Sequence, residues 1–405
     1  MPKKVILYID MNSFFVSCHE IINPQLKNKP VVVASSSRRA IVSSASYTAR
    51  KYQIRSAMPL YQAKQICPQL ICLSADFSLY TLYARKIYKL LKTMITNKIE
   101  IASTDEYCLD ITDVYHKYGT VKNCAIFIQK LILEKIKLPC SIGVSYNKFL
   151  AKMASKINKP QGIFIFNENN IAQKLWPLDI KDLYGIGKKT ADRLRKHNIN
   201  TIYDFAHCQD SNLLLGLYGK GYVVLQKKAL GINDTDFDFE FIKRKSLSYD
   251  FTLEYDTSDI LLIHDYILKL ALKIHFKTKI LLVGGKQVTF AFKNEQRKWI
   301  SKQMQLETFT NNLDVIYSTA LILFEQIWNQ KPIRALRINL GKITPLYQAT
   351  RQLEMLKVNG CSRDFAKQSL QSKLIQDIND KYQQEISMSG ANFLNVFNST
   401  KPFKF

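Results

Sequence analysis

The sequence predicts a multidomain α+β protein, and three observations support this. Residues 4–166 alternate between apolar runs of strand length and amphipathic helical patterns, whereas residues 167–232 contain only short helical patterns. Residues 243–347 then return to strand–helix alternation. With 405 residues, 47% of them hydrophobic, the chain has room for roughly two to four domains with well-formed cores.

The first region alternates strands and helices in a way that predicts a central sheet. A largely apolar run at 4–10 is typical of a strand buried on both faces. We expect further strands at 31–34, 40–43, twice within 99–112, at 139–145 and at 162–166. Helical patterns occur at 47–52, 59–67, 78–98, 121–135 and 147–156.

The second α+β region follows a polar connector at 231–236. Strands are expected at 246–253, 286–292 and 333–340, and long helices at 260–276 and 312–329. The order strand, helix, strand, helix, strand predicts a compact module. Beyond about residue 348 the chain is polar, with one more helical pattern at 365–382.

Charge narrows the class of partner. The chain has 58 Lys and Arg against 33 Asp and Glu, a net charge of +25, which favours nucleic acid first and an anionic membrane surface second. No apolar run reaches the roughly 18 residues of a membrane span, and the start does not resemble a signal peptide, so we expect a cytoplasmic protein. None of the eight cysteines forms a Cys-x-x-Cys pair, so we expect reduced core residues and no zinc site.

Two acidic clusters stand at strand ends about ninety-five residues apart in the sequence. Asp10 closes the first strand, and Asp105 and Glu106 lie in a tight turn between two others. Carboxylates gathered in so basic a chain predict a bound cation, and oxygen ligands without His or Cys favour magnesium. A pair of such ions can drive phosphoryl or nucleotidyl transfer. Asp110 lies five residues past Asp105 and should point to the opposite face of the strand, so we interpret it as structural or solvated and not as a ligand.

With these residues in view, the chain resembles the Y-family DNA polymerases, the translesion enzymes, and most closely the DNA polymerase IV type. The similarity runs from residue 4 to about 341. Besides the first strand with Asp10 and the Phe14–Phe15 pair, its motifs are ASYTARKY at 45–52, STDE at 103–106 with Leu109-Asp110, GVSYNK at 143–148 leading to NKPQG at 158–162, and GIG at 185–187.

The resemblance implies a right-hand polymerase with an added α+β little-finger domain. Its implied parts are a palm at 1–18 and 76–166, fingers at 19–75, a helical thumb with a helix-hairpin-helix at 167–232, a linker at 233–242, the little finger at 243–346 and a tail at 347–405. It further implies a template-directed, low-fidelity polymerase that uses Mg²⁺, dNTPs and primer-template DNA. We expect a monomer that docks on a sliding clamp.

The resemblance also implies roles for individual residues. Asp10, Asp105 and Glu106, with the backbone carbonyl of Met11, would hold two Mg²⁺ ions. The remaining nucleotide-site residues would be Phe15 as the sugar gate, Phe14 beside it with the character of a core residue, and Tyr47, Arg50 and Lys159 on the triphosphate.

DNA and clamp contacts are implied in the C-terminal half. Glycines of the hairpin would let helix N-terminal amides meet a DNA phosphate, and basic side chains would bind the backbone. The candidates are Gly185, Gly187, Lys188 and Lys189 in the thumb, and Lys243, Arg244, Lys245, Lys293, Arg297 and Arg337 in the little finger. A clamp-binding peptide would be formed by Gln352, Leu353, Met355 and Leu356.

Three alternatives remain open at this point. The stretch 373–382 resembles tails of Gram-positive relatives of the polymerase V catalytic subunit, which leaves the subfamily undecided. A catalytically weak DNA-binding scaffold is opposed by the intact acidic and basic set. A nucleotidyl cyclase is opposed by the thumb and the basic module.

Thr104, Tyr107 and Cys108 depart from the commoner residues of the family motif without removing a carboxylate.

Overall fold

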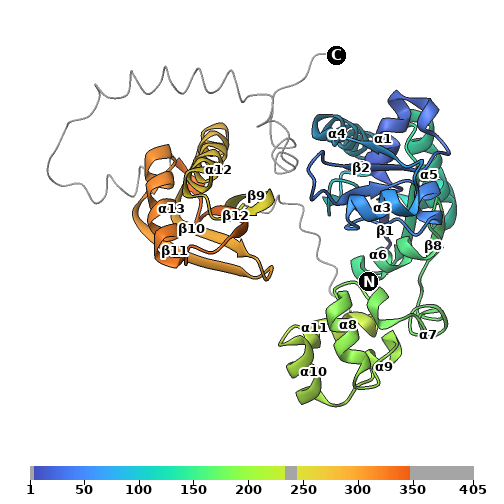
Figure 1. Cartoon of the computed structure of the whole chain (residues 1–405). Helices are drawn as coiled ribbons and strands as arrows, with labels where there is room; N and C mark the ends of the chain where they lie inside the picture. Colours follow the sequence, from blue (N-terminus) through green and yellow to red (C-terminus); the bar gives the residue numbers. More distant parts are fainter. Residues whose placement is uncertain (1–3, 233–243, 347–405) are drawn as a thin grey trace, which may run out of the picture. The chain divides into compact units, whose positions relative to one another are not determined.

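A computed structural model of the protein describes residues 4–232 and 244–346 (Figure 1). These residues form two compact units, the larger almost entirely from 4–232 and the smaller almost entirely from 244–346. Each unit has its own apolar core. The expected linker at 233–242 and the expected tail at 347–405 lie outside the described residues.

A five-stranded sheet organises the larger unit. Its strand order is β5–β6–β1–β7–β8, and β1 pairs antiparallel with both β6 and β7. The central position of β1 explains why its sequence is apolar on both faces. The strands are β1 (Ile6–Met11), β5 (Ile99–Ile101), β6 (Glu106–Asp110), β7 (Cys140–Ser145) and β8 (Ile163–Ile165).

Helices cover both faces of this sheet. Helices α4 (Phe77–Met94) and α5 (Val121–Ile136) share one core cluster with Leu7 and Ile9 of β1. Helix α6 (Lys148–Ile157) packs on the other face, against β1 and β7. Because side chains alternate along a strand, Tyr8 and Asp10 lie on the α6 face.

A smaller sheet, β3–β2–β4, stands beside the first. Its elements are β2 (Val31–Ala34), β3 (Val42–Ala45), β4 (Ile71–Leu73), α2 (Tyr47–Lys51) and α3 (Leu60–Ile66). The strand predicted at 40–43 begins two residues later, and β4 was not predicted. Helix α1 (Phe14–Ile22) was also not predicted from the sequence. Two short 3-10 helices, η1 (Pro24–Leu26) and η2 (Tyr115–Tyr118), complete the larger unit up to residue 166.

Short helices fill residues 167–232, as predicted. They are α7 (Ile171–Lys174), η3 (Ile180–Asp182), α8 (Lys188–Arg195), α9 (Ile202–Ala206), α10 (Ser211–Tyr218) and α11 (Tyr222–Ala229). Their core includes Phe149, Leu150 and Met153 of α6. Helix α6 therefore contacts both the large sheet and the helical region.

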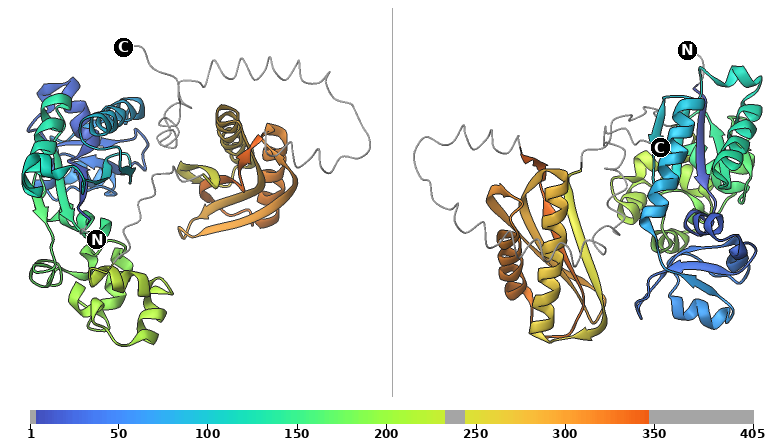
Figure 2. Two further views of the ribbon diagram at one scale, coloured as in Figure 1. Left: turned by 180° about the vertical axis from the view of Figure 1, so that it is seen from behind. Right: turned by 90° about the horizontal axis from the view of Figure 1, so that it is seen from above.

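The smaller unit is a sheet with two helices on one face (Figure 2). Its elements are β9 (Ser246–Thr257), α12 (Ile260–Leu281), β10 (Val283–Asn294), β11 (Trp299–Thr310), α13 (Leu313–Ile327), β12 (Ile333–Gly341) and β13 (Thr344–Pro345). The prediction of three strands is wrong, because β11 forms an edge of the sheet, in the order β11–β10–β12–β9. Lys302, Gln303 and Gln305 make it too polar for a buried strand pattern.

The cysteines and the apolar character of the helices were both considered from the sequence. Seven of the cysteines lie in the described residues and all are free thiols, five of them buried, as predicted. No helix in the described ranges combines the length and apolar character needed to cross a membrane.

Candidate active site

The two acidic clusters meet where β1 and β6 lie side by side. Asp10 and Glu106 are directly opposite each other in the antiparallel register. The backbone N–H of Met11 donates to the carbonyl of Asp105 at 3.0 Å, which extends the pairing past the strand end. Residues brought from positions ninety-five apart thus share one end of the sheet, as the sequence predicts.

Asp10 is buried and paired with a lysine. Its side chain makes an ion pair with Lys159 at 2.5 Å, and the residue is 8% exposed. Burial raises the pKa of Asp10 to about 6, against the opposing charge of Lys159, and the charges of Glu106 and Asp105 raise it further. Three carboxyl groups thus lie close together at this end of the sheet, and a cation stabilises the ionised form of Asp10 there.

Glu106 has two partners on a single oxygen. Its Oε2 accepts hydrogen bonds from the hydroxyl of Tyr8 at 2.9 Å and from Nζ of Lys152 at 2.7 Å. Burial opposes ionisation of Glu106, but the hydrogen bond and charge of Lys152, helped by Tyr8, hold its pKa below the ordinary value. Glu106 is accordingly an ionised carboxylate in a fixed position.

Asp105 is held by its own turn. Its Oδ1 accepts from the hydroxyl of Ser103 at 2.7 Å, while its backbone N–H reaches the same hydroxyl at 3.3 Å. Burial raises the pKa of Asp105, against the hydrogen bond from Ser103. Asp110 is at the other end of β6 and accepts from Thr112 at 2.6 Å, which confirms its structural role.

The carboxylates of Asp10, Asp105 and Glu106 lie near one another, but each bonds a different side chain. Across residues 4–232 and 244–346, no three His, Cys, Asp or Glu side chains are arranged as a ready metal cluster. Lys159, Lys152 and Ser103 each engage one carboxylate. The donor set nevertheless fits Mg²⁺ in its chemistry, since it consists of carboxylate oxygens without His or Cys. A cation at Asp10 would have to replace Lys159 as the partner of its Oδ1.

A cavity of about 240 Å³ opens over Asp10 and Asp105. Its lining includes eight of the nine residues predicted for the metal and nucleotide sites: Asp10, Met11, Phe14, Phe15, Tyr47, Arg50, Asp105 and Lys159. The lining also includes four serines that were not predicted: Ser13, Ser43, Ser44 and Ser56. Glu106 is not among its lining residues, in keeping with the position of its Oε2 under Lys152.

Phe15 forms one aromatic wall of the cavity. Its ring stacks on Tyr80 with centroids 4.1 Å apart and an interplanar angle of 13°. The hydroxyl of Tyr80 is 2.8 Å from Nε2 of His19, which fixes the supporting ring. Phe14, by contrast, is 3% exposed and belongs mainly to the core.

Tyr47 and Arg50 approach from α2. They are three residues apart on one turn of the helix, and the Arg50 guanidinium lies 4.7 Å from the centre of the Tyr47 ring. Nε of Arg50 donates to the carbonyl of Ala45 at 3.2 Å. This leaves the terminal nitrogens of the guanidinium to face an anion.

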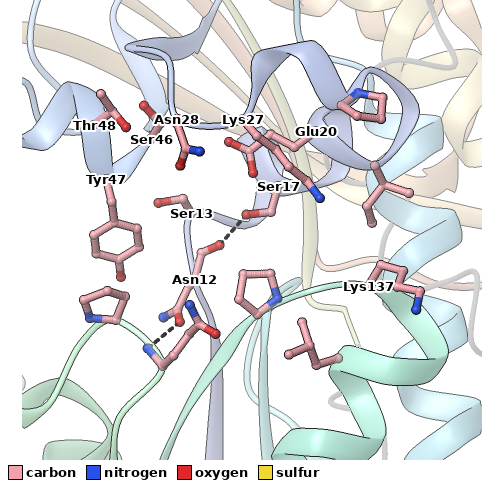
Figure 3. Close-up of a pocket in the computed structure, with 16 residues that line it drawn as sticks. Asn12, Ser13, Ser17, Glu20, Lys27, Asn28, Ser46, Tyr47, Thr48 and Lys137 are labelled. Atoms are coloured by element: carbon pink, nitrogen blue, oxygen red, sulfur yellow. Dashed lines mark hydrogen bonds between the residues drawn. The ribbon is translucent and has the colours of Figure 1, made fainter.

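A second cavity, of about 450 Å³, shares Ser13 and Tyr47 with the first (Figure 3). Its central residue Asn12 is already satisfied by protein. The side-chain oxygen of Asn12 accepts from the backbone N–H of Gln161 at 2.8 Å, and its carbonyl accepts from Ser17 at 2.8 Å. These contacts brace the wall behind Tyr47, and we assign the cavity no ligand.

The predicted thumb residues form a turn before α8. Gly185 has φ of +108°, a conformation that favours glycine, and Gly187 is the residue before the first turn of α8. A Cβ added at Gly187 would meet nothing within 4 Å, so its backbone is open to a ligand. Lys188 and Lys189 open the helix that follows.

The predicted little-finger residues are only partly gathered. Lys293 and Arg337 lie on the sheet face opposite the helices, both beside Trp299, at 5.8 and 4.5 Å from its ring centre. Arg297 lies in the turn between β10 and β11, whereas Arg244 and Lys245 precede β9 at the other end of the strands. Lys243, Gln352, Leu353, Met355 and Leu356 lie outside the described residues.

Sequence comparison identifies the family. Residues 9–156 match the impB/mucB/samB family, residues 168–199 match the HHH motif of the IMS family, and residues 244–355 match the family's C-terminal domain. The chain is 36% identical to DNA polymerase IV of Oceanobacillus iheyensis over 88% of this chain and 87% of the relative. The chain belongs to the Y family of DNA polymerases.

Further relatives and solved structures agree. The Y-family chain is 33% identical to DNA polymerase IV 1 of Bacillus subtilis, covering 100% of this chain and 97% of the relative. A Y-family DNA polymerase chimera matches 84% of this chain and 99% of its own at 29% identity and a TM-score of 0.74. An insertion ternary complex of Dbh DNA polymerase matches with the same coverage at 28% identity and a TM-score of 0.56.

These matches resolve the question of subfamily and confirm the enzyme class. The relatives are DNA polymerases IV, and one of them aligns with the whole length of this chain, so the length of the tail does not argue for the polymerase V type. The Y-family chain is a DNA-directed DNA polymerase. The right-hand fold with a little-finger domain is confirmed.

Proposed function

We propose that this polymerase performs low-fidelity translesion synthesis by two-metal nucleotidyl transfer to a primer 3′-hydroxyl. The observation that carries the proposal is the meeting of Asp10 with Glu106 and Asp105 beside a cavity lined by Phe15, Arg50 and Lys159. This places acidic groups suited to cations next to basic groups suited to a triphosphate. In this proposal the palm, fingers, thumb and little finger have the bounds expected from the sequence.

The carboxylates would bind the metal ions. Asp10, Asp105 and Glu106, with the carbonyl of Met11, would hold two Mg²⁺ ions. Bound there, the ions would acidify the primer hydroxyl and stabilise the leaving pyrophosphate. The ion pair between Asp10 and Lys159 supports the need for a cation at this point, and its opening would free Lys159 for the triphosphate.

The remaining cavity residues would bind and select the nucleotide. Arg50 offers a planar guanidinium for bidentate contact with phosphate, and Tyr47 lies beside it. Helix α1 begins at Phe14 on the cavity wall, so its first backbone N–H groups lack partners within the helix and suit an anion. Phe15, fixed against Tyr80, would exclude a 2′-hydroxyl.

DNA contacts would be non-specific. The open backbone at Gly187 with Lys188 and Lys189 suits a primer phosphate, and Lys293 with Arg337 suits the duplex backbone. Docking on a sliding clamp through Gln352, Leu353, Met355 and Leu356 remains part of the proposal on sequence grounds, as does the monomeric state.

Primer extension tests the function directly. The wild type should extend a primer in Mg²⁺ with all four dNTPs and pass an abasic template base. Asp105→Ala/Glu106→Ala should lose extension, whereas Glu100→Ala, a carboxylate of the same sheet paired with Lys148, should retain it. Tight DNA binding by the wild type without extension would favour the scaffold alternative.

A further inference from the structure

Three side chains on one face of the sheet surround the carboxylate of Glu106. Tyr8 stands two residues before Asp10 on β1, and Glu106 is directly opposite Asp10 on β6. Tyr8 is therefore the diagonal neighbour of Glu106, within reach of a long side chain. Lys152 comes to the same point from α6, which covers this face.

Tyr8 and Lys152 converge on the same atom. Both bond Oε2 of Glu106, and Nζ of Lys152 also donates to the hydroxyl of Tyr8 at 2.9 Å. The Tyr8 hydroxyl thus accepts from the lysine and donates to the carboxylate, so the three groups form a closed triangle. Among the described residues Oε1 of Glu106 has no hydrogen bond, which leaves that oxygen to an incoming ligand.

Burial and the packing of α6 hold the triangle of Tyr8, Lys152 and Glu106 in place. The side chains of Lys152 and Glu106 are only 12% and 18% exposed, so water competes little for their hydrogen bonds. Gly143 on β7 allows α6 to pack closely, because a Cβ there would be 2.0 Å from the carbonyl of Ala151. The close approach of α6 to β7 at Gly143 therefore determines how far Lys152 lies from the sheet.

The thumb covers the triangle. Nζ of Lys152 lies 4.2 Å from the centre of the Tyr184 ring, and Nζ of Lys156 lies 5.4 Å from it. The backbone N–H of Tyr184 contacts Sδ of Met153 on the same helix at 3.4 Å. Tyr184 immediately precedes Gly185, so the loop that opens the predicted DNA-binding hairpin also packs on Lys152.

We propose that Tyr8 and Lys152 are positioning residues that hold Glu106 by Oε2 and present Oε1 to a divalent cation. The inference rests on the proposed metal-dependent function of the site. Groups that bond a metal ligand fix its orientation, and their loss weakens metal binding by about tenfold or more. A purely structural ion pair would not need the tyrosine hydroxyl on the same oxygen.

Tyr8→Phe is the direct test because it removes only the hydroxyl. Binding of Mn²⁺ to the protein with DNA and a non-hydrolysable dNTP, followed by electron paramagnetic resonance, should weaken about tenfold. The Mg²⁺ concentration for half-maximal extension should rise in parallel. The affinity for DNA and the KM for dNTP at saturating Mg²⁺ should stay unchanged.

Tyr107→Phe is the matched control. Tyr107 is the next residue after Glu106 but points to the opposite face, where its hydroxyl donates to the carbonyl of Ala84 at 3.0 Å. The control should keep the wild-type affinity for Mn²⁺. Equal affinities for Mn²⁺ in Tyr8→Phe, Tyr107→Phe and wild type would overturn the inference.

A double-mutant cycle separates positioning from general stability. Lys152→Met should weaken Mn²⁺ binding, and Tyr8→Phe/Lys152→Met should lose less than the product of the two single losses, because both act through one oxygen. Fully multiplicative losses would contradict the shared role. If the wild type bound no Mn²⁺, the proposed function itself would fail; wild-type binding with an unaffected Tyr8→Phe would reject only the present inference.

Discussion

A Cβ built on Gly143 would stand 2.0 Å from the carbonyl oxygen of Ala151 and 2.2 Å from the backbone N of Ser155. Glycine at this position of β7 is what lets α6 lie directly on the sheet. Because α6 carries Lys152 and leads to Lys159, this close approach helps to position the lysines that pair with Glu106 and Asp10.

Gly143→Ala should destabilise the larger unit by about 2–3 kcal/mol, because the added methyl meets backbone that cannot rotate away. Chemical denaturation followed by circular dichroism measures the loss. Gly216→Ala in α10 is the matched control, since a Cβ there meets nothing within 4 Å and alanine is the better helix former. Equal midpoints for the two variants would contradict the packing argument.

The sequence predicted the meeting of Asp10 with Asp105 and Glu106 for a physical reason. Asp10 lies near the end of β1 and Glu106 begins β6, and antiparallel pairing places the end of one strand beside the start of its neighbour. The proximity of Tyr47 and Arg50 could also be predicted from the sequence, because residues three apart in a helix lie on the same face.

Contacts that depend on tertiary packing could not be predicted. Lys152 reaches Glu106 from 46 residues away only because α6 packs closely at Gly143, and no local pattern encodes that height. Strand β11 was missed because an edge strand with a solvated face lacks a continuous apolar run. Among the basic residues, Lys293 and Arg337 share one face of the sheet, whereas Arg244 precedes β9 at the other end of the strands; the sequence alone does not give this strand register.

Phe15→Ala should admit ribonucleotides. The ring is held on Tyr80, so it cannot easily yield to a 2′-hydroxyl, and its removal should reduce discrimination against ribonucleotides by about 10–200-fold. Single-nucleotide insertion with dNTP and rNTP gives the ratio of kcat/KM values. Phe127→Ala, at a half-exposed phenylalanine of α5, should leave the ratio intact. Strict exclusion by Phe15→Ala would remove the gate assignment.

Arg50→Ala should raise the KM for dNTP by about tenfold or more, since a charge-assisted contact with phosphate contributes about 1.5–3 kcal/mol. Steady-state insertion kinetics at saturating Mg²⁺ measure the change. Lys51→Ala removes a positive charge from the same helix at an exposed position outside the cavity, and should change KM little. A similar change in both variants would indicate a general charge effect.

Arg337→Ala should weaken binding to duplex DNA of any sequence and reduce the slope of log K against log salt by about one, as expected for the loss of one phosphate contact. The side chain of Arg337 is 42% exposed beside Trp299, and its 3.4 Å contact with Asp250 is a surface pair whose loss costs little stability. Fluorescence anisotropy over a range of salt concentrations gives the slope. Lys269→Ala removes a charge from α12, on the opposite side of the sheet, and should leave the slope unchanged. An unchanged slope for Arg337→Ala would place the DNA backbone elsewhere on the little finger.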